Sequence, residues 1–274
     1  MKPARFEYVR AQTIADAHKV IADKPDARII AGGQTLVPML SMRLARPSAV
    51  VDIMRIASLS KIEETGGAIR VGATVRQAAL LAWPGLAGKQ PLLGAALPWV
   101  GHAQTRNRGT VCGSVAHADP SAEIPLVLVA LNGTVELSSL RGTRRIAAPE
   151  FFTGLMTTER ADHEMIEAVH FPLRAQRCGY AFNEYGRRHG DFAIVSCAVV
   201  AQAKSVRVTI GGVSDRPVAL NIESAGDEEI ANALNDFAWS LNARDDLHAT
   251  AAYRRELVRQ MGLRTIREAR ACIR

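Results

Sequence analysis

AGGQTLVPMLSMRL, residues 31–44, sets two adjacent glycines after a short apolar run and continues through a polar pair into a second apolar segment. The preceding ARII, residues 27–30, predicts a short buried strand, so the glycine pair falls where that strand ends. Glycine allows close approach to the backbone, and successive N–H groups in such a turn can form an anion site over residues 32–35. A glycine pair is more commonly a plain structural turn, and both interpretations stay open from this stretch alone.

A second glycine-bearing loop, TVCGS at residues 110–114, has a similar character. Both loops place hydroxyl or amide side chains beside consecutive backbone N–H groups, as at Gln34, Thr35, Thr110 and Ser114. Neither loop matches the GxxxxGK[ST] or GxGxxG pattern of known phosphate-binding turns. Each loop taken singly is therefore a weak indication of a phosphate site.

Size and composition predict a globular protein of one large domain or two modest ones. The chain has 274 residues, of which 48% are apolar and 22% charged. No segment approaches the ~18 uninterrupted apolar residues of a membrane span, and the N-terminal MKPARFEYVRAQT lacks the apolar core of a secretory signal. We therefore expect a cytoplasmic protein. The net charge of +7 is dispersed, and with no nucleic-acid motif it is interpreted as a solvated surface.

The cysteines argue against a metal centre in this chain. Cys112, Cys178, Cys197 and Cys272 include no CxxC pair and no spacing typical of iron–sulfur or zinc ligands. We expect reduced thiols.

The first 172 residues predict two lobes. In the first lobe, about 1–57, a helix over 13–25 is capped by Thr13 with Asp16 three residues later, and a strand follows over 48–54. In the second lobe, 58–172, we expect a strand over 68–75 and strands and turns over 133–139, 143–152 and 163–172. Helices are expected over 74–83 and 91–101, and a buried helix begins near Pro120 with Asp119 as its cap.

The remaining chain predicts a separate α+β domain over 176–274, with the boundary inside FPLRAQRCGYAF (171–182). Three strands are expected over 181–188, 193–203 and 205–215, the middle one nearly all apolar and therefore buried. Two helices are expected to follow, over 226–242 and 250–271. Strands followed by helices are typical of an α+β fold.

Four segments together resemble the FAD-binding medium subunit of the molybdenum hydroxylases, the family of carbon monoxide dehydrogenase and xanthine dehydrogenase. They are residues 31–53, 105–125, 187–200 and 245–258, in the family's order and spacing. The resemblance implies an α+β fold with a two-lobed FAD-binding domain like that of vanillyl-alcohol oxidase (PCMH type). A smaller C-terminal domain of the carbon monoxide dehydrogenase flavoprotein type would follow it.

The resemblance also implies where the cofactor lies. The FAD pyrophosphate is expected between the two glycine loops, with Gly101 and His117 close by. The residues assigned in this way to the loops and their surroundings are Ile29, Ile30, Ala31, Gly32, Gly33, Gln34, Thr35, Leu36, Gly101, Thr110, Val111, Cys112, Gly113, Ser114 and His117.

Further assignments come from the same resemblance. Glu123 takes the place of an acidic residue that contacts the cofactor, Arg187 that of a basic residue near the flavin ring, and Phe192 that of an aromatic residue covering the ring. Arg160 and Ile166 are looser assignments from the strand region before the boundary.

The implied activity is electron transfer. A large subunit with a molybdopterin cofactor would hydroxylate the substrate, an N-heterocycle or an aldehyde. A small subunit with [2Fe–2S] centres would pass electrons to FAD on this chain, and an external acceptor would receive them. The resemblance suggests a dimer of such heterotrimers. No residue is assigned as catalytic, because no nucleophile–base or paired-carboxylate pattern is readable.

Several interpretations stay open beside this one. The chain could be a stand-alone FAD-dependent oxidase or reductase of the same fold, or a scaffold that has lost FAD. Many relatives have glycine where this chain has Cys112, which tolerates positive φ poorly, so we expect an ordinary backbone conformation there. A redox role for Cys112 is the alternative to simple packing.

Overall fold

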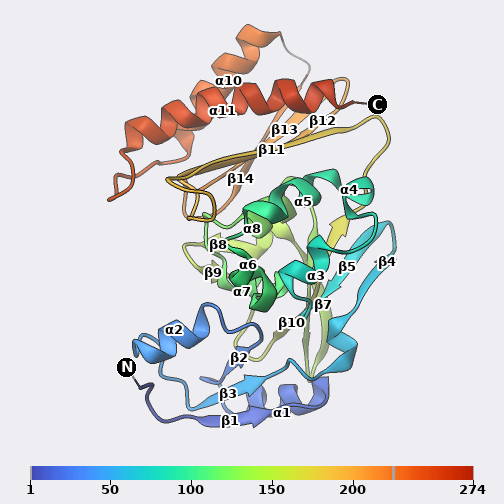
Figure 1. The fold of residues 1–274 in the computed structure, drawn as a ribbon, viewed down its shortest axis with the longest axis vertical. Coiled ribbons are helices and arrows are strands. Elements are labelled where there is room, and N and C mark those ends of the chain that lie inside the picture. The colour runs from blue at the N-terminus through green and yellow to red at the C-terminus, as the bar shows by residue number, and fades with distance from the viewer. Residues whose placement is uncertain (1, 224–225, 274) are drawn as a thin grey trace.

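The computed structural model describes residues 2–223 and 226–273, which form three stacked parts (Figure 1). An N-terminal lobe lies at one end, a central sheet covered by short helices lies in the middle, and a second sheet beneath two long helices lies at the other end (Figure 1). The mixed helix and sheet content agrees with the α+β class expected from the sequence.

The N-terminal lobe is a small parallel sheet with the strand order β1-β3-β2. Its elements are β1 (Glu7–Arg10), α1 (Ile14–Asp23), β2 (Arg28–Ile30), α2 (Leu36–Ser41) and β3 (Ala49–Asp52). The predicted cap of α1 is confirmed, because Thr13 and Asp16 form a reciprocal capping box. The prediction that β2 is buried is wrong: it is an edge strand and is only partly covered. β1 was not expected, because its mostly exposed residues show no apolar pattern.

The central sheet is antiparallel, with the order β4-β5-β10-β6-β7. Its strands are β4 (Ile62–Thr65), β5 (Ala68–Gly72), β6 (Thr134–Ser139), β7 (Gly142–Ala147) and β10 (Met165–Pro172). The other elements of this part are η1 (Ala57–Ser60), α3 (Gln77–Leu81), α4 (Leu86–Lys89), α5 (Pro91–Ala96), η2 (Leu97–Trp99), α6 (Ala103–Arg108), α7 (Val111–His117), α8 (Glu123–Ala130), α9 (Ala148–Phe151), β8 (Phe152–Gly154) and β9 (Thr157–Thr158).

The segment before α8 differs from the prediction. Instead of a long loop, residues 103–117 form the short helices α6 and α7, and α8 begins at Glu123 rather than near Pro120. Asp119 does not cap α8, because its Oδ1 accepts a hydrogen bond from Ser121 N at 2.8 Å within the preceding turn. The residue at the cap of α8 is Ala122, which offers no side-chain hydrogen bond.

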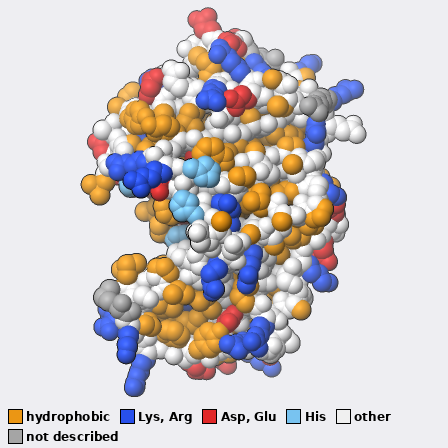
Figure 2. Space-filling view, viewed as in Figure 1, with side chains coloured by type: hydrophobic (Ala, Val, Ile, Leu, Met, Phe, Trp, Pro, Cys, Tyr) orange, Lys and Arg blue, Asp and Glu red, His pale blue; other side chains and the backbone are white. Residues whose placement is uncertain are grey.

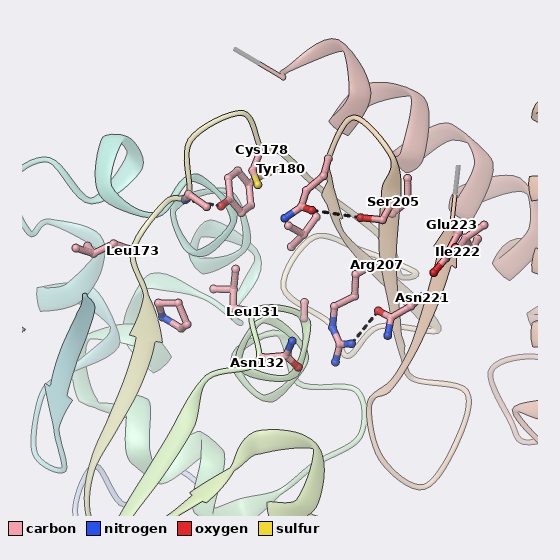
Figure 3. A pocket seen from close by; sticks show the side chains of 16 residues that line it. Leu131, Asn132, Leu173, Cys178, Tyr180, Ser205, Arg207, Asn221, Ile222 and Glu223 are labelled. Atoms are coloured by element: carbon pink, nitrogen blue, oxygen red, sulfur yellow. Dashed lines mark hydrogen bonds between the residues drawn. The ribbon is translucent and has the colours of Figure 1, made fainter. Parts of the chain in front are cut away.

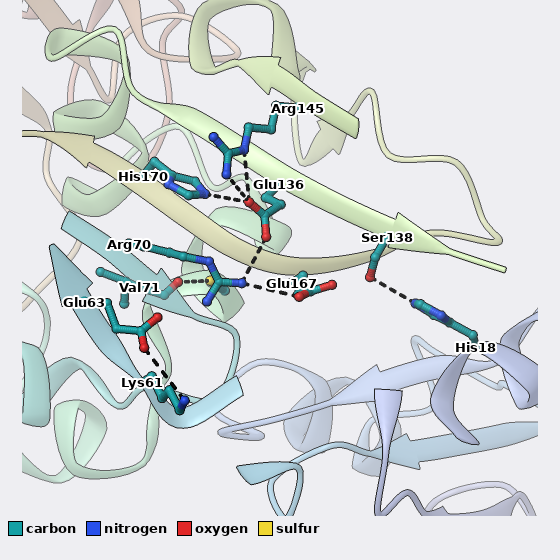
Figure 4. A network of polar contacts seen from close by, with 11 residues as sticks. His18, Lys61, Glu63, Arg70, Val71, Glu136, Ser138, Arg145, Glu167 and His170 are labelled. Atoms are coloured by element: carbon teal, nitrogen blue, oxygen red, sulfur yellow. Dashed lines mark hydrogen bonds and ion pairs between the residues drawn. The ribbon is translucent and has the colours of Figure 1, made fainter. Parts of the chain in front are cut away.

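A polar network ties four strands of the central sheet together around Glu136 on β6 (Figure 4). Glu136 accepts hydrogen bonds from Arg70 on β5 at 2.9 Å, Arg145 on β7 at 2.7 Å and His170 on β10 at 2.9 Å. Burial alone would raise the pKa of Glu136, but the hydrogen bonds from Arg70, Arg145 and His170 outweigh it and hold the pKa at about 2. Glu136 is therefore an ionised carboxylate although only 7% of it is exposed.

The C-terminal sheet is antiparallel, with the order β11-β12-β13-β14, and is followed by two helices. Its elements are β11 (Gly179–Tyr185), β12 (Val195–Ala201), β13 (Ser205–Gly211), β14 (Val218–Glu223), α10 (Asp227–Ser240) and α11 (Ala251–Ala271). The predicted β12 is buried along nearly its whole length, as expected. β14 was not expected, because it is a partly exposed edge strand that includes Asn221 and Glu223.

Both faces of this sheet are covered, and α8 helps to cover one of them. One face packs with α10 and α11 around a second core. The other face packs on α5 and α8, and Ala198 of β12 belongs to the same core cluster as the central part. All eight residues of α8 are buried, and the helix is apolar almost all round. Among the described residues, no helix is both long and apolar enough to cross a bilayer.

Candidate functional site

The first glycine loop is a tight turn between β2 and α2. Gly33 has φ +72°, a conformation that glycine adopts without the strain an L side chain would meet. Gln34 Nε2 donates a hydrogen bond back to Gly32 O at 3.3 Å. The turn thus leads directly from the end of the strand into the first turn of the helix.

The two residues just before the second loop, Arg108 and Gly109, lie directly against the first loop. A Cβ on Gly32 would sit 2.2 Å from Arg108 O and 2.8 Å from Gly109 Cα, so no larger residue fits at this crossing. The second loop is anchored by backbone hydrogen bonds from Gln77 N to Gly109 O at 2.9 Å and from Val111 N to Val75 O at 3.0 Å. The structure therefore brings together two loops that are about 75 residues apart in sequence.

A pocket of about 570 Å³ opens beside this crossing. Five residues of the first loop region line it, and the remaining lining comes from β1, α2, the end of β3, the residue before α3 and the end of α6. The lining residues are Tyr8, Ile30, Ala31, Gly32, Gly33, Gln34, Val37, Pro38, Asp52, Met54, Arg76 and Arg108. Figure 2 shows a deep hollow between the N-terminal lobe and the rest of the molecule, with basic and histidine side chains along its wall.

The pocket favours anions. Its one carboxylate, Asp52, already accepts hydrogen bonds from Tyr8 Oη and from Met54 N. Arg76 and Arg108 have exposed side chains that make no hydrogen bond or ion pair with the described residues. Two available guanidinium groups beside glycine backbone suit a phosphate-bearing ligand.

Sequence reasoning missed most of the pocket outside the first loop. Asp52 and Met54 follow β3, which runs parallel to β2, and the carboxyl ends of neighbouring parallel strands meet at one sheet edge. That signal was available in the sequence. The structure places Arg108 in the pocket, whereas Arg106 donates to the carbonyls of residues 98, 100 and 101.

The residues expected to form the second loop are helical from Val111 onward. Thr110 caps α7 by accepting a hydrogen bond from Gly113 N at 3.1 Å. The Val111 and Cys112 side chains are buried in the core, whereas Gly113, Ser114 and His117 lie on the accessible side of the helix. This part of the site therefore offers one helix face rather than a loop.

Cys112 has the ordinary backbone conformation expected for it, because it lies in the first turn of α7. Its Sγ donates to Val71 O at 3.4 Å. Burial raises the pKa of the Cys112 thiol to about 12. A thiol held protonated in this way is a poor nucleophile, and this favours packing over a redox role.

Glu123 lies at the start of α8 and is only 6% exposed. Burial raises its pKa to about 7, and the nearby charge of Asp119 adds to the rise while Arg106 opposes it. Neighbouring His117 lies 4.0 Å from Asp119 Oδ2. Glu123 is thus a buried carboxyl whose pKa lies near neutral pH.

The loop that contains Arg187 and Phe192, the two residues expected to contact the flavin ring, packs against Gly101. A Cβ on Gly190 would lie 2.5 Å from the His102 ring and 3.0 Å from Gly101 O, so this loop crosses the 101–102 turn closely. Arg187 Nη2 donates to Leu247 O at 3.1 Å. Phe192 is 71% exposed, so its ring has room to meet a ligand.

Of the expected residues, only Ile30, Ala31, Gly32, Gly33 and Gln34 line the pocket, and five of the others lie near it or elsewhere as follows. Thr35 and Leu36 begin the turn into α2, where they continue from the lining residues. Arg160 donates to Ala161 O at 2.8 Å and Glu164 O at 2.7 Å within its own turn. Ile166 is a core residue on β10, and Ile29 lies on β2. The pocket lining therefore gives no support for a cofactor contact at these five residues.

The fold and the site define a binding protein for a phosphate-bearing cofactor. The residues fit a dinucleotide, because a Cβ at Gly32 would fill the crossing of the two loops and the two arginines supply positive charge. Residues 4–174 match the family described as the FAD binding domain in molybdopterin dehydrogenase. Residues 180–269 match the CO dehydrogenase flavoprotein C-terminal domain. The chain belongs to this family of FAD-binding subunits.

Similar proteins match this chain over nearly its full length. The chain is 38% identical to the nicotine 6-hydroxylase medium subunit of Paenarthrobacter nicotinovorans, over 99% of both chains. It is 31% identical to the carbon monoxide dehydrogenase medium chain of Hydrogenophaga pseudoflava, over 98% of both. The solved quinoline 2-oxidoreductase of Pseudomonas putida 86 superposes with a TM-score of 0.91 and 33% identity, over 99% of both chains.

These findings establish the general role. The chain is an FAD-carrying medium subunit of a molybdenum hydroxylase complex, and hence part of an oxidoreductase. The sequence prediction of family and fold is confirmed. Within the described residues, no group of three or more histidine, cysteine, aspartate or glutamate side chains is arranged to hold a metal ion.

Proposed function

We propose that the chain is the electron-transfer subunit of a heterotrimer. It takes electrons from [2Fe–2S] centres of a small subunit and passes them to an external acceptor, while a large molybdenum subunit hydroxylates the substrate. FAD supplies the capacity to exchange electrons singly or in pairs. The observation that carries the proposal is the contact of Gly32 with Arg108 and Gly109, which builds one anion-favouring pocket from two distant loops.

The substrate is proposed to be an N-heterocycle or an aldehyde. Relatives that span nearly the whole chain are named for nicotine, with 38% identity, and for glyceraldehyde, with 31% identity. The higher identity to the nicotine hydroxylase subunit favours the heterocycle. We also propose the assembly into a dimer of heterotrimers and a cytoplasmic location.

The chain's own residues bind and orient the cofactor. We propose that the backbone of residues 29–36, with Arg76 and Arg108, holds the pyrophosphate, and that Gly101, Thr110–Ser114 and His117 border it. Glu123, Arg187 and Phe192 are proposed to lie toward the flavin end, with Arg160 and Ile166 as further members of the site. We place the domain boundary between 172 and 176, which the two family matches support.

The test compares Gly32→Ala with Gly88→Ala. A methyl group at position 32 would collide with Arg108 O, whereas Gly88 has nothing within 4 Å of the added Cβ. We expect the purified full chain to release FAD on denaturation, identified by its visible spectrum and by chromatography. Gly32→Ala should weaken FAD binding by about 5- to 150-fold, since overpacking costs roughly 1–3 kcal/mol. Gly88→Ala should retain the cofactor.

Two results would count against the proposal. One is a full chain that neither carries FAD nor takes it up on reconstitution, and the other is Gly32→Ala with unchanged FAD affinity. Turnover of a small-molecule substrate by the isolated chain would instead favour the stand-alone oxidase.

A further inference from the structure

The loop between β11 and β12 carries Arg187 and Phe192, the two residues proposed to lie toward the flavin end of the cofactor site. It spans residues 186–194, and a backbone hydrogen bond from Ile194 N to Tyr185 O, at 2.8 Å, closes its base. Phe192 is 71% exposed, so the packing of its own side chain holds it only weakly. The position of both residues in the site therefore depends on what holds the loop.

One side of this loop rests on the FAD-binding part of the chain. The centroid of the His189 ring lies 4.9 Å from that of the Trp99 ring, with 32° between the ring planes. A Cβ on Gly190 would lie 2.5 Å from the His102 ring. Ring packing and close backbone approach thus hold this side of the loop.

The other side of the loop contacts the segment between α10 and α11. Arg187 Nη2 donates a hydrogen bond to Leu247 O at 3.1 Å. The turn around Leu247 is ordered by Asp246, whose Oδ1 accepts hydrogen bonds from His248 N at 2.8 Å and from Ala249 N at 2.9 Å. The Leu247 carbonyl is therefore presented to the loop from a turn that the Asp246 carboxylate folds.

Arg254 joins this turn to the other end of the loop. It lies in the first turn of α11 and is 5% exposed. Its Nη2 donates to Asp246 Oδ2 at 2.6 Å, and its Nη1 donates to Ile194 O at 2.6 Å and to Gly212 O at 2.5 Å. Gly212 in turn donates its N–H to Pro120 O, in the FAD-binding part, at 2.8 Å. One guanidinium group thus connects the loop, the turn and the FAD-binding part.

The contacts of Arg254 require an arginine. A planar guanidinium can donate to two backbone carbonyls with one nitrogen and to a carboxylate with the other, whereas a lysine has a single nitrogen for all three acceptors. Burial would raise the pKa of Asp246, but the hydrogen bonds from Ala249 N, His248 N and Arg254 outweigh it and hold the pKa at about 2. The charge of Arg254 is therefore compensated throughout the neutral range.

We propose that Arg254 is a positioning residue for the cofactor site: it fixes both ends of the loop that carries Arg187 and Phe192, and so sets where these two side chains meet the flavin. The link to the flavin rests on the proposed function, in which Arg187 and Phe192 belong to the FAD site. The hold of Arg254 on the loop is independent of that function and can be measured without the cofactor.

Arg207 provides a matched control at the opposite end of the same strands. It lines a pocket of about 350 Å³ between the C-terminal sheet and the FAD-binding part (Figure 3). Its Nη1 donates to Asn221 Oδ1 at 3.0 Å and its Nη2 to Val129 O at 3.3 Å. Like Arg254, it connects the sheet to the FAD-binding part, but it pairs with Val200 at the end of β12 that lies away from the loop. Its loss should leave the loop in place.

The first test measures amide hydrogen exchange in the purified full chain, followed residue by residue by NMR. Arg254→Lys should speed exchange at Ile194 and His248 by ~10-fold or more, the factor that corresponds to about one lost hydrogen bond of a charged group. Arg207→Gln should leave both rates unchanged. Unchanged exchange at Ile194 in Arg254→Lys overturns the proposal.

A second variant keeps this test readable if Arg254→Lys does not fold. The Asp246 side chain is 47% exposed, so Asp246→Asn is the milder change. It removes the negative charge that Arg254 meets, and it should also speed exchange at Ile194, to which Asp246 itself donates and accepts nothing among the described contacts. A parent-like rate at Ile194 in this variant counts against the proposal.

The second test measures the midpoint potential of FAD bound to the full chain. Arg187→Met and Phe192→Leu should each shift the potential, because charged and aromatic groups beside a flavin ring tune it. In the Arg254→Lys background the same changes should shift it much less, since the loop no longer holds these side chains at the ring. If Arg254 served stability alone, Arg254→Lys would lower the melting temperature but leave the potential of the folded chain unchanged.

The outcomes separate the two proposals. Additive effects of Arg254→Lys and Phe192→Leu on the potential overturn the positioning role, even where the loop exchanges faster. If Arg187→Met and Phe192→Leu leave the potential unchanged in the parent chain, or the chain binds no FAD, the proposed flavin contacts are wrong. The exchange rate at Ile194 then still decides whether Arg254 holds the loop.

Discussion

The central sheet and the interface under the C-terminal sheet both bury glutamate, yet they treat it in opposite ways. Glu136 is 7% exposed and Glu123 is 6% exposed. Glu136 accepts hydrogen bonds from two arginines and a histidine, and its pKa is held at about 2. No arginine or histidine of the described residues donates a hydrogen bond to Glu123, and burial raises its pKa to about 7. Burial alone thus does not decide whether a carboxyl is charged; the donors around it do.

The two sites also differ in what they do for the molecule. The Glu136 network joins β5, β6, β7 and β10 and keeps its charge within one sheet (Figure 4). On the face of the C-terminal sheet that packs on α8, by contrast, Glu184 Oε2 and Ser196 Oγ are buried and have no hydrogen-bond partner among the described residues. A satisfied network is typical of a structural role, and unsatisfied groups are typical of a functional one.

The largest expected effect comes from Glu136→Gln. The neutral amide removes the charged partner shared by Arg70, Arg145 and His170 and leaves the half-buried Arg70 with only the longer contact to Glu167, so we expect a loss of ~3 kcal/mol in unfolding free energy at neutral pH. Because the pKa of Glu136 is lowered, its contribution is full above about pH 4.5 and is lost as the pH falls toward about 2. Urea unfolding at several pH values should therefore show a shallower acid fall in the variant.

The control for this variant is Glu167→Gln. Glu167 accepts only the longer hydrogen bond from Arg70, at 3.3 Å, and should cost much less. Equal losses in the two variants would show that Glu136 is not the centre of the network.

A smaller effect is expected from Arg145→Gln. The Arg145 side chain is 58% exposed, so water replaces much of its interaction with Glu136. We expect a loss of ~0.5–1 kcal/mol in urea unfolding. A loss as large as that of Glu136→Gln would mean that the exposed arginine, rather than Arg70 and His170, holds the carboxylate ionised.

The smallest effect is expected from Ser196→Ala. Removing a buried hydroxyl that has no partner sacrifices no hydrogen bond, so the unfolding free energy should stay within ~0.5 kcal/mol or rise slightly. Thermal unfolding gives the comparison, with Thr265→Ala as the control because its hydroxyl is hydrogen-bonded to Met261 O and Asn183. If Ser196→Ala destabilises the chain more than Thr265→Ala, the hydroxyl has a partner such as an ordered water.

Much of the fold was readable in the sequence where periodicity and capping agree. The helix after Thr13 and the apolar β12 are found where they were expected. Two edge strands escaped prediction, because the mostly exposed β1 and the partly exposed β14, with Asn221 and Glu223, show no clear apolar pattern. The region 103–119 was misjudged, because its glycines and polar residues suggested a loop while Thr110 caps a helix there.

The site was predicted in part. The first glycine loop was recognised from its residues, and its pairing with the second loop came from the family resemblance. Arg76 could not be found from the sequence, because it reaches the pocket only through the backbone bridge to Thr110. The alignment of Glu184 with Ser196 depends on strand register, which no local pattern encodes.

Helix α8 bears on how the polypeptide can be divided. Its eight buried residues are shielded by neighbouring helices and by strands β12 to β14, which lie beyond the boundary near residue 174. A gene cut at that boundary would leave each fragment with a bare apolar surface that only the other fragment fits. We therefore expect the two halves to be insoluble apart and to reassociate when they are synthesised together, as complementing fragments of a single folding unit.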